Sequence, residues 1–454
     1  MLAAELEHII NSMDESTVPP PSSGGPLKLL KNKRVLVPIV AVLVAGLGIG
    51  GYFLVWHLAK NQQGAQLQSL GLSADAQKVS QQLSNGYCSG IGSKKLGSAP
   101  FHKADLGVVI PYGLMVQAHV TPIDHQYYYP INARAPRDTY DVLAPGDGTI
   151  SSIEHRTEFV GQTHPGQAPT DDWRVVIVYS CSFFSYYDLM TSLDPSVKSQ
   201  MPSDWDSNGH SGVNIPVKQG QVVGKLGNQS LDFAVWDLMK KPLSGLLVPV
   251  AYDAEPWKPY TAPPLDYFSD EVKAQILPHY IRTVEPLDGK IDYDLEGKLI
   301  GNWFRVGTNG YTGSTDPHNR PNYWENHLAF VYNNLDPRMV ELSLGNFGGQ
   351  AVQYAVKGNS PDPAKISQSA GMVKYEVVSF DFDTPAGQKW DGQELVKPLV
   401  AKVGDSVLGT VLVQLTGAHQ LKAEMFPGKS AAQVSGFTSK AVMYNRGDDA
   451  KGTN

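Results

Sequence analysis

The sequence is poor in cysteine and in charge. Its 454 residues include only two cysteines, Cys88 and Cys181, so the clustered cysteine spacings that hold structural zinc are absent. Charged residues make up 18% of the chain, and the net charge is −7. Basic residues cluster only at residues 28–34. This composition excludes a nucleic-acid partner, because affinity for a polyanion depends on many lysine and arginine contacts.

Two kinds of pattern are also missing. The chain contains no GxSxG motif, the signature of a serine nucleophile on a strand-to-helix turn. After Phe101, no helical patterns of about 10–15 residues alternate with the β-rich runs, which argues against a parallel α/β fold. Glycine and proline are frequent instead, with 44 and 32 copies. We therefore expect a mainly β, turn-rich chain.

One long apolar run stands near the N-terminus. Residues from Val35 to Trp56 carry no charge, and a helix over this run would be about 30 Å long, enough to cross a bilayer core. Basic residues precede it and only Lys60 follows closely, so the positive-inside rule places residues 1–34 in the cytoplasm and the bulk of the chain outside. We predict a single-pass, uncleaved signal anchor in the cell membrane.

Two alternatives to a signal anchor agree less well with the sequence. A cleaved signal peptide disagrees with the length of the run and with its exit sequence HLAK, which offers no A-x-A site. A buried core helix disagrees with a segment that is apolar on every face. Gly46 and Gly50 fit the small-xxx-small pattern of paired spans, which indicates a homodimer through the membrane. The tail at 1–34, with its PPPSSGGP stretch, is predicted to be disordered.

Residues 57–100 are rich in Gln, Ser and Gly and are predicted to form a stalk. Within them we expect a short helix over Ala74–Leu83, capped by Ser73. Both cysteines lie on the outer side, where a disulfide between Cys88 and Cys181 would join the stalk to the first domain. The alternative is a pair of buried, unpaired thiols.

Two β domains are predicted after the stalk. Residues 101–280 carry short β-rich runs separated by turns such as APGDG and KQGQ, and predict an antiparallel sandwich or barrel with a Pro-rich extension. In that extension Ser269 should cap a helix that ends at Ile276. Residues 281–447 contain seven further strand candidates and predict a second barrel or sandwich.

Gly301-Asn302-Trp303 begins the second domain with a short motif. It resembles the Gly-x-Trp start of lipocalin-like barrels, in which an arginine on the last strand packs over the tryptophan. That resemblance implies that Arg446 packs over Trp303. The alternative is an ordinary buried tryptophan beside a turn glycine.

A longer resemblance covers Leu106 to Asp237. The runs YDVLAPGDGTISSI, VVIVYS, SYYDL and IPVKQGQVVGKLGNQSLDFAVWD resemble the lysostaphin/LytM-type zinc endopeptidase domain, a peptidoglycan peptidase family. The matching framework consists of turn residues: Pro145, Gly146, Gly148, Gly220, Gly224 and Gly227. The resemblance is therefore first a resemblance of fold.

The residues that carry that family's chemistry differ here. In HVTPIDH, which supplies His119, Asp124 and His125, the interval from His to Asp is one residue longer than the family's His-x-x-x-Asp. The family's Tyr-x-His-Leu turn reads Tyr-Tyr-Asp-Leu, with Asp188 in place of the histidine. In its last strand Asp232 stands in place of the ligand histidine, and neither catalytic histidine is retained.

Three interpretations of these polar residues remain open. They can form a ligand groove of His119, Asp124, His125, Asp188 and Asp232. Zinc can be held by His119, Asp124 and Asp232, because imidazole and carboxylate donors suit it. The third interpretation makes His119 a surface residue and Asp124 a turn cap.

The leading functional hypothesis is a membrane-anchored envelope protein. Its peptidase-like domain would act as a non-catalytic binding or regulatory module, for a cell-wall or surface polymer. The alternative is a metal-dependent cell-wall endopeptidase of the lysostaphin/LytM type with altered ligands. A further alternative is a structural assembly component that uses its span and stalk to hold partners.

Overall fold

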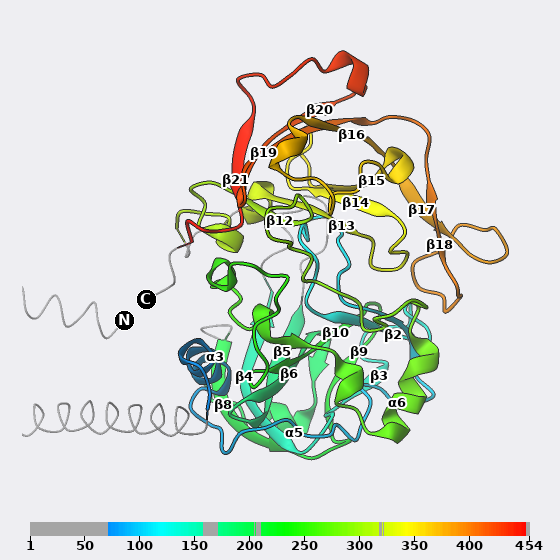
Figure 1. Cartoon of the computed structure of the whole chain (residues 1–454). Helices are drawn as coiled ribbons and strands as arrows, with labels where there is room; N and C mark the ends of the chain where they lie inside the picture. The colour runs from blue at the N-terminus through cyan, green and yellow to red at the C-terminus, as the bar shows by residue number, and fades with distance from the viewer. Residues whose placement is uncertain are drawn as a thin grey trace, which may run out of the picture. The chain divides into compact units, whose positions relative to one another are not determined.

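The computed structural model describes residues 71–157, 171–203, 205, 210–316, 320 and 322–450, and this part of the chain is mainly β (Figure 1). The predicted cytoplasmic tail at 1–34 and membrane span at 35–56 lie outside these residues. Within the described ranges, no helix is both long enough and apolar enough to cross a membrane. Every described residue belongs to one compact unit, which begins at Leu67.

The first β module is built on an antiparallel sheet of eight strands, in the order β1-β2-β10-β6-β5-β4-β8 with β11 paired to β10. A smaller sheet, β3-β9-β7, covers one face of it. The strands of both sheets are β1 (Leu106–Ile110), β2 (Gln126–Pro130), β3 (Tyr140–Leu143), β4 (Gly148–Arg156), β5 (Asp172–Ser180), β6 (Phe183–Met190), β7 (Ser192–Leu193), β8 (His210–Val217), β9 (Val222–Leu226), β10 (Leu231–Asp237) and β11 (Thr261–Ala262).

The core of this module lies between its two sheets. Val175 and Phe233 from the large sheet pack in one buried cluster with Val142 and Val223 from the small sheet. Burial of such side chains is the main force that holds two sheets together. The predicted antiparallel sheets of residues 101–280 are thus present.

The structure explains why glycine is required at two positions of the sequence motif. Gly220 turns the chain between β8 and β9 with a φ of +75°, a backbone conformation that favours glycine. At Gly227, an added Cβ would lie 1.9 Å from the carbonyl oxygen of Pro136. A match to these positions therefore reports turns and close backbone contacts, and says nothing of chemistry.

Helix α3 (Ala74–Ser84) changes the interpretation of the predicted stalk. The helix begins as expected, with the Ser73 side chain accepting a hydrogen bond from the Ala76 amide at 3.2 Å. Its apolar face packs with Val176 and Phe184 of the sheet, and Figure 1 shows it beside β4. A disulfide joins Cys88 to Cys181. The described part of the 57–100 segment is therefore folded onto the first module and is not a free spacer.

Other helices of the described chain are short. The helix α6 (Asp270–Ile276) is capped by the Ser269 side chain, as predicted. The remaining helices are α5 (Pro195–Lys198), η3 (Pro249–Tyr252), η4 (Lys258–Tyr260), η5 (Pro264–Asp266), η6 (Leu277–His279), η7 (Gly310–Thr312), η8 (Tyr323–Asn326), η9 (Lys357–Asn359), η10 (Gln368–Ala370) and η11 (Ala431–Gln433).

The second β module is a closed antiparallel barrel of eight strands. Pairing of the first and last strands closes it, with Phe304 opposite Asn445. Trp303 and Phe330 are fully buried in its interior. The barrel strands are β12 (Gly301–Arg305), β13 (His327–Tyr332), β14 (Val340–Leu344), β15 (Val352–Val356), β16 (Val373–Val378), β19 (Gly409–Gly417), β20 (Gln420–Pro427) and β21 (Val442–Asn445).

An excursion leaves the barrel between β16 and β19. It contains a two-stranded sheet of β17 (Phe380–Asp383) and β18 (Val400–Val403). Phe382, Trp390 and Leu399 of this excursion pack in one apolar cluster with Val108 and Ile110 of β1. The two β modules therefore share a hydrophobic contact as well as a chain connection.

Candidate functional site

The candidate site is a cavity of about 620 Å³ on one face of the large sheet. Its walls come from α3, from strands β2, β4, β5, β6 and β10, and from the segments around Asp124 and Lys258. Two tyrosines of the second module, Tyr311 and Tyr323, complete the lining. The five residues singled out from the sequence all line this cavity: His119, Asp124, His125, Asp188 and Asp232.

Strand register brings the two aspartates together. Asp232 of β10 lies directly opposite Asp188 of β6, and opposite Tyr127 of β2 on its other side. Because side chains alternate along a strand, Tyr186 shares the cavity face with Asp188. The SYYDL segment, predicted to be a turn by the family resemblance, is in fact the interior of strand β6.

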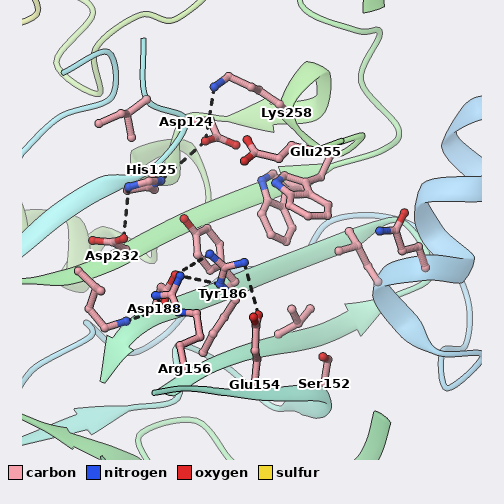
Figure 2. A pocket seen from close by; sticks show the side chains of 18 of the residues that line it. Asp124, His125, Ser152, Glu154, Arg156, Tyr186, Asp188, Asp232, Glu255 and Lys258 are labelled. Atoms are coloured by element: carbon pink, nitrogen blue, oxygen red, sulfur yellow. Dashed lines mark hydrogen bonds and ion pairs between the residues drawn. The ribbon is translucent and has the colours of Figure 1, made fainter. Parts of the chain in front are cut away.

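Asp188 is held by two arginines. Arg174 donates from Nε and Nη2 to Asp188 Oδ2 at 2.9 and 2.6 Å, and Arg156 donates to Asp188 Oδ1 (Figure 2). Asp188 is only 2% exposed. Burial alone would raise the pKa of its carboxyl, but Arg174 and Arg156 lower it below the ordinary value. The Asp188 carboxylate is therefore ionised and fully engaged with guanidinium groups.

His125 lies between the other two carboxylates. Its Nε2 is 3.3 Å from Asp232 Oδ2, and its Nδ1 is 3.7 Å from Asp124 Oδ1 (Figure 2). Burial lowers the pKa of His125, but Asp232 and then Asp124 raise it above the ordinary value overall. The two aspartates therefore stabilise the charged form of the imidazole relative to its neutral form.

The two aspartates beside His125 differ in their acidity. Burial raises the pKa of Asp232 to about 6, with Asp188 adding to the effect and His125 opposing it. Asp124 is equally buried, but Lys258, with Nζ at 3.9 Å from Asp124 Oδ1, and His125 lower its pKa to about 2. Asp124 is thus the fixed anion of this group, and Asp232 is the one that titrates nearer neutrality.

His119 is set apart from this charge cluster. Its side chain is exposed, and its ring centroid lies 6.2 Å from that of His125. It lines the cavity, yet no ion pair with Asp124 or Asp232 is formed. His119 is therefore exposed, as the surface interpretation of HVTPIDH expects. Asp124 is buried at the cavity wall, as the groove interpretation expects.

The predicted zinc ligands do not fit a metal ion. Across the described ranges, no group of three His, Cys, Asp or Glu side chains is placed to hold one. The position between Asp124 and Asp232 is taken by the His125 ring, and Lys258 already supplies a cation to Asp124. The Lys258 ammonium would also repel a divalent ion bound to Asp124. We therefore derive no chemistry through zinc at His119, Asp124 and Asp232.

Several important cavity residues escaped prediction from sequence. Glu154 and Arg156 lie on β4, and Arg174 lies on the neighbouring strand β5. Arg174 Nη1 is 3.7 Å from Glu154 Oε2. Polar side chains at alternate positions of a β run lie on one face of the sheet, and this pattern could have predicted a polar face here. Trp257 and Lys258 lie in the Pro-rich extension, where no periodic pattern marks them.

Aromatic rings lie among the charged groups of the cavity. Tyr186 stacks on Trp236 with ring centroids 4.9 Å apart, and Trp236 contacts Trp257 at 5.3 Å. The Lys258 ammonium lies 4.6 Å from the ring centroid of Tyr311, a cation–π distance. The cavity therefore combines charged and aromatic side chains, which suits ligands with polar and apolar parts.

No protein-family model matches the sequence, and no curated protein matches it. Solved structures to which the chain is similar include Helicobacter pylori Csd3, at 16% identity over 32% of this chain and 31% of that chain, with a TM-score of 0.19. A zinc-containing peptidase from Vibrio cholerae is 18% identical over 33% of this chain and 40% of that chain, with a TM-score of 0.20. Lysostaphin from Staphylococcus simulans is 7% identical over 78% of this chain and 92% of that chain, with a TM-score of 0.22.

The chain spans about a third of the Csd3 structure and two fifths of the Vibrio cholerae peptidase that it matches. Similarities of this size assign neither the fold nor an activity to this chain.

Proposed function

We propose that this protein is a single-pass, membrane-anchored envelope protein whose first β module binds a cell-wall or surface polymer without cleaving it. The observation that carries the proposal is the Asp188 carboxylate, which two arginines hold at the position where the resembling peptidase family has a histidine. An Asp188 carboxylate engaged in this way has a structural role in the cavity wall and cannot exchange a proton as a histidine at this position would.

The chemistry of the cavity argues against hydrolysis. Acyl transfer needs donors that stabilise a developing oxyanion. At the two positions that correspond to family histidines, this chain places the side chains of Asp188 and Asp232, and an ionised carboxylate has no N–H group to donate to such a charge. His125 is held between Asp124 and Asp232, with one ring nitrogen directed at each carboxylate, so neither nitrogen is free to act as a general base.

The shape and lining of the cavity favour binding. A volume of about 620 Å³ is in the range of ligand pockets. Trp257 and Tyr323 are only partly buried, so their rings are available to stack on a sugar or peptide group. Glu154 and Arg174 keep about a third of their side-chain surface exposed at the same site.

The proposed location depends on the apolar run from Val35 to Trp56. The basic residues before it place the N-terminal tail in the cytoplasm and both β modules outside. A disulfide between Cys88 and Cys181 suits an oxidising compartment. Gly46 and Gly50 support pairing of two such spans. Membrane fractionation followed by alkaline extraction should leave the full-length chain in the pellet, and release into the soluble fraction would contradict the anchor.

Binding can be tested by co-sedimentation of the full-length protein, purified in detergent, with insoluble cell-wall polymer. We expect retention of the wild type, and for Trp257→Ala about tenfold weaker retention, equivalent to about 1.4 kcal/mol. Tyr87→Ala is the matched control, because Tyr87 is 49% exposed and is not part of the cavity lining.

Two results would overturn the proposal. The first is a wild-type protein that is not retained by any wall preparation. The second is chelator-sensitive release of peptides from the polymer, which would favour the metal-dependent endopeptidase.

A further inference from the structure

We propose that the cavity recognises a neutral sugar ring of the polymer, and not its peptide part. This inference rests on the proposed binding function and specifies the class of ligand. It is carried by accessible polar side chains where helix α3 meets strand β4, by an aromatic ring close to them, and by the position of the cavity over strands that are paired on both sides.

Three accessible polar side chains gather where α3 meets β4. Ser152 and Glu154 lie at alternate positions of β4 and share the cavity face (Figure 2). Asn85, which ends α3, donates to the carbonyl oxygen of Ser151 at 2.7 Å, and this bond holds the end of the helix, with Gln82, beside the strand. Gln82 is exposed, and Ser152 and Glu154 are half-buried. A ligand in the cavity can therefore reach all three side chains.

These three side chains have free hydrogen-bonding capacity. The Gln82 amide and the Ser152 hydroxyl make no hydrogen bond to any residue that the structure describes. The Glu154 carboxylate lies 3.7 Å from Arg174 Nη1, which is longer than a hydrogen bond. An amide and a hydroxyl both donate and accept, and a carboxylate accepts. Neighbouring hydroxyl groups on a sugar ring, each a donor and an acceptor, match this mixed set.

An aromatic ring lies close to the polar set. Trp257 is half-buried and lines the cavity. It packs in one apolar cluster with Leu83, the residue that follows Gln82 on α3. A sugar ring has an apolar face of C–H groups and a rim of hydroxyls, so it can stack on an indole while its rim forms hydrogen bonds. The cavity offers both kinds of contact on one side.

The acidic groups deeper in the cavity leave little unmatched charge for a ligand. His125 lies between Asp124 and Asp232, and Lys258 Nζ is 3.9 Å from Asp124 Oδ1. Burial raises the pKa of Glu255, and Asp124 adds to the effect, so its neutral form is favoured. A charged ligand would lose its hydration here without gaining a free counter-charge, which is costly. A neutral ligand avoids that cost.

The sheet under the cavity does not suit the backbone of a peptide. Its cavity residues come from β2, β10, β6, β5 and β4. Within the described sheet each of these strands lies between two neighbours, in the order β1-β2-β10-β6-β5-β4-β8. Extended peptides are commonly bound by pairing with a free strand edge. Recognition on this face depends on side chains instead, which sugar hydroxyls can satisfy.

Calorimetric titration of the full-length protein, in a detergent without a sugar headgroup, tests the class of ligand. The probes are two neutral trisaccharides, triacetylchitotriose and maltotriose, and the neutral peptide acetyl-Ala-Ala-Ala-amide. We expect one of the sugars to bind at least tenfold more tightly than the peptide. Tighter binding of the peptide, or binding of neither sugar, would overturn the inference.

Two glutamine variants test the location of the sugar. Gln82→Ala should weaken binding of the trisaccharide about threefold to tenfold, the effect of one lost hydrogen bond. Gln81→Ala is the matched control, because Gln81 is the neighbouring residue on the same helix and is not part of the cavity lining. It should leave binding unchanged. Circular dichroism checks that both variants are folded, and equal affinities of the two variants would overturn the assignment to this side of the cavity.

The polymer assay separates this inference from the proposed function. Native wall polymer is compared with the same polymer after enzymatic removal of its peptides. Retention of the protein by the peptide-free form supports the sugar assignment. Retention by the native form alone overturns it and leaves polymer binding intact, whereas retention by neither form overturns polymer binding as well.

Discussion

The guanidinium carbon of Arg446 lies 3.7 Å from the ring centroid of Trp303. Trp303 begins the barrel on β12 and Arg446 directly follows β21, so the contact joins the two ends of the barrel. Arg446 donates from Nη1 to Asp294 Oδ1 at 2.9 Å and to a backbone carbonyl oxygen, and from Nη2 to two more. The arrangement predicted from the Gly-Asn-Trp motif is present in the structure.

Substitution of Arg446 should destabilise the barrel strongly. Arg446→Met keeps much of the apolar contact with Trp303 but leaves the buried Asp294 without its cation. Removal of one partner of a buried pair costs about 3–5 kcal/mol. Urea unfolding followed by tryptophan fluorescence measures the change. Arg305→Met is the control, because Arg305 is exposed on β12, and it should cost no more than about 0.5 kcal/mol.

Asp188 should be required for the arrangement of charged groups in the cavity. Asp188→Ala leaves the partly buried Arg156 and Arg174 without their shared acceptor. Hydrogen bonds to charged groups are worth about 1.5–3 kcal/mol, and we expect a loss in that range. Thermal and urea unfolding would check it. Asp147→Ala removes an ion pair whose side chains are 80% and 61% exposed, and an equal loss there would contradict the special role of Asp188.

The charge of His125 should depend on Asp232. Because the pKa of His125 is raised in the folded protein, its stabilising contribution is complete below its ordinary pKa of about 6.5 and is lost as the pH rises through the folded-state value. The pKa of Asp232 is also raised, to about 6, so its protonation likewise stabilises the folded state, and this contribution is lost as the pH rises through about 6. Asp232→Asn should therefore lower the pKa of His125, measured by NMR titration of its imidazole nitrogens. An unchanged pKa would contradict this coupling.

Reduction should destabilise the first module. The disulfide closes a loop between residues 93 positions apart and holds the segment after α3 to the turn between β5 and β6. Loss of such a cross-link costs about 2–5 kcal/mol. The Cys88→Ser, Cys181→Ser double variant should unfold at lower urea than wild type, and reductant should lower the wild type to the same midpoint. A reductant effect on the double variant itself would show that another process is involved.

Turn and capping signals predicted local structure well. The serine caps of α3 and α6 and the glycine turns of the first module depend on a few neighbouring residues, so the sequence displays them directly. Strand β15 was not predicted, because its first three residues are half-buried and VQYAV lacks a clear alternation. Strand β18 was also missed, because it is only four residues long and none of them is fully buried. Whether a half-buried strand forms depends on its neighbours in the sheet.

The candidate site was predicted only in part. The strand position of Asp232 follows from the motif framework, whereas Asp188 was expected in a turn and lies on strand β6. The register of β6 and β10 then brings both aspartates to one cavity. The partners that decide their chemistry are distant in sequence. Arg156 and Arg174 come from two other strands, and Lys258 comes from a segment without periodicity. Interactions of this range depend on tertiary packing, which one sequence does not display.

The excursion between β16 and β19 limits how the molecule can be divided. Trp390 and Leu399 cover Val108 and Ile110 of β1, so a chain cut near residue 280 would present that apolar strand to water. An isolated first module should self-associate, and fragments that end there would report on an uncovered edge and not on ligand recognition. Proteolysis in the loop around residues 384–399 would instead separate β17 from β18 along the chain, while the strands of the barrel stay paired.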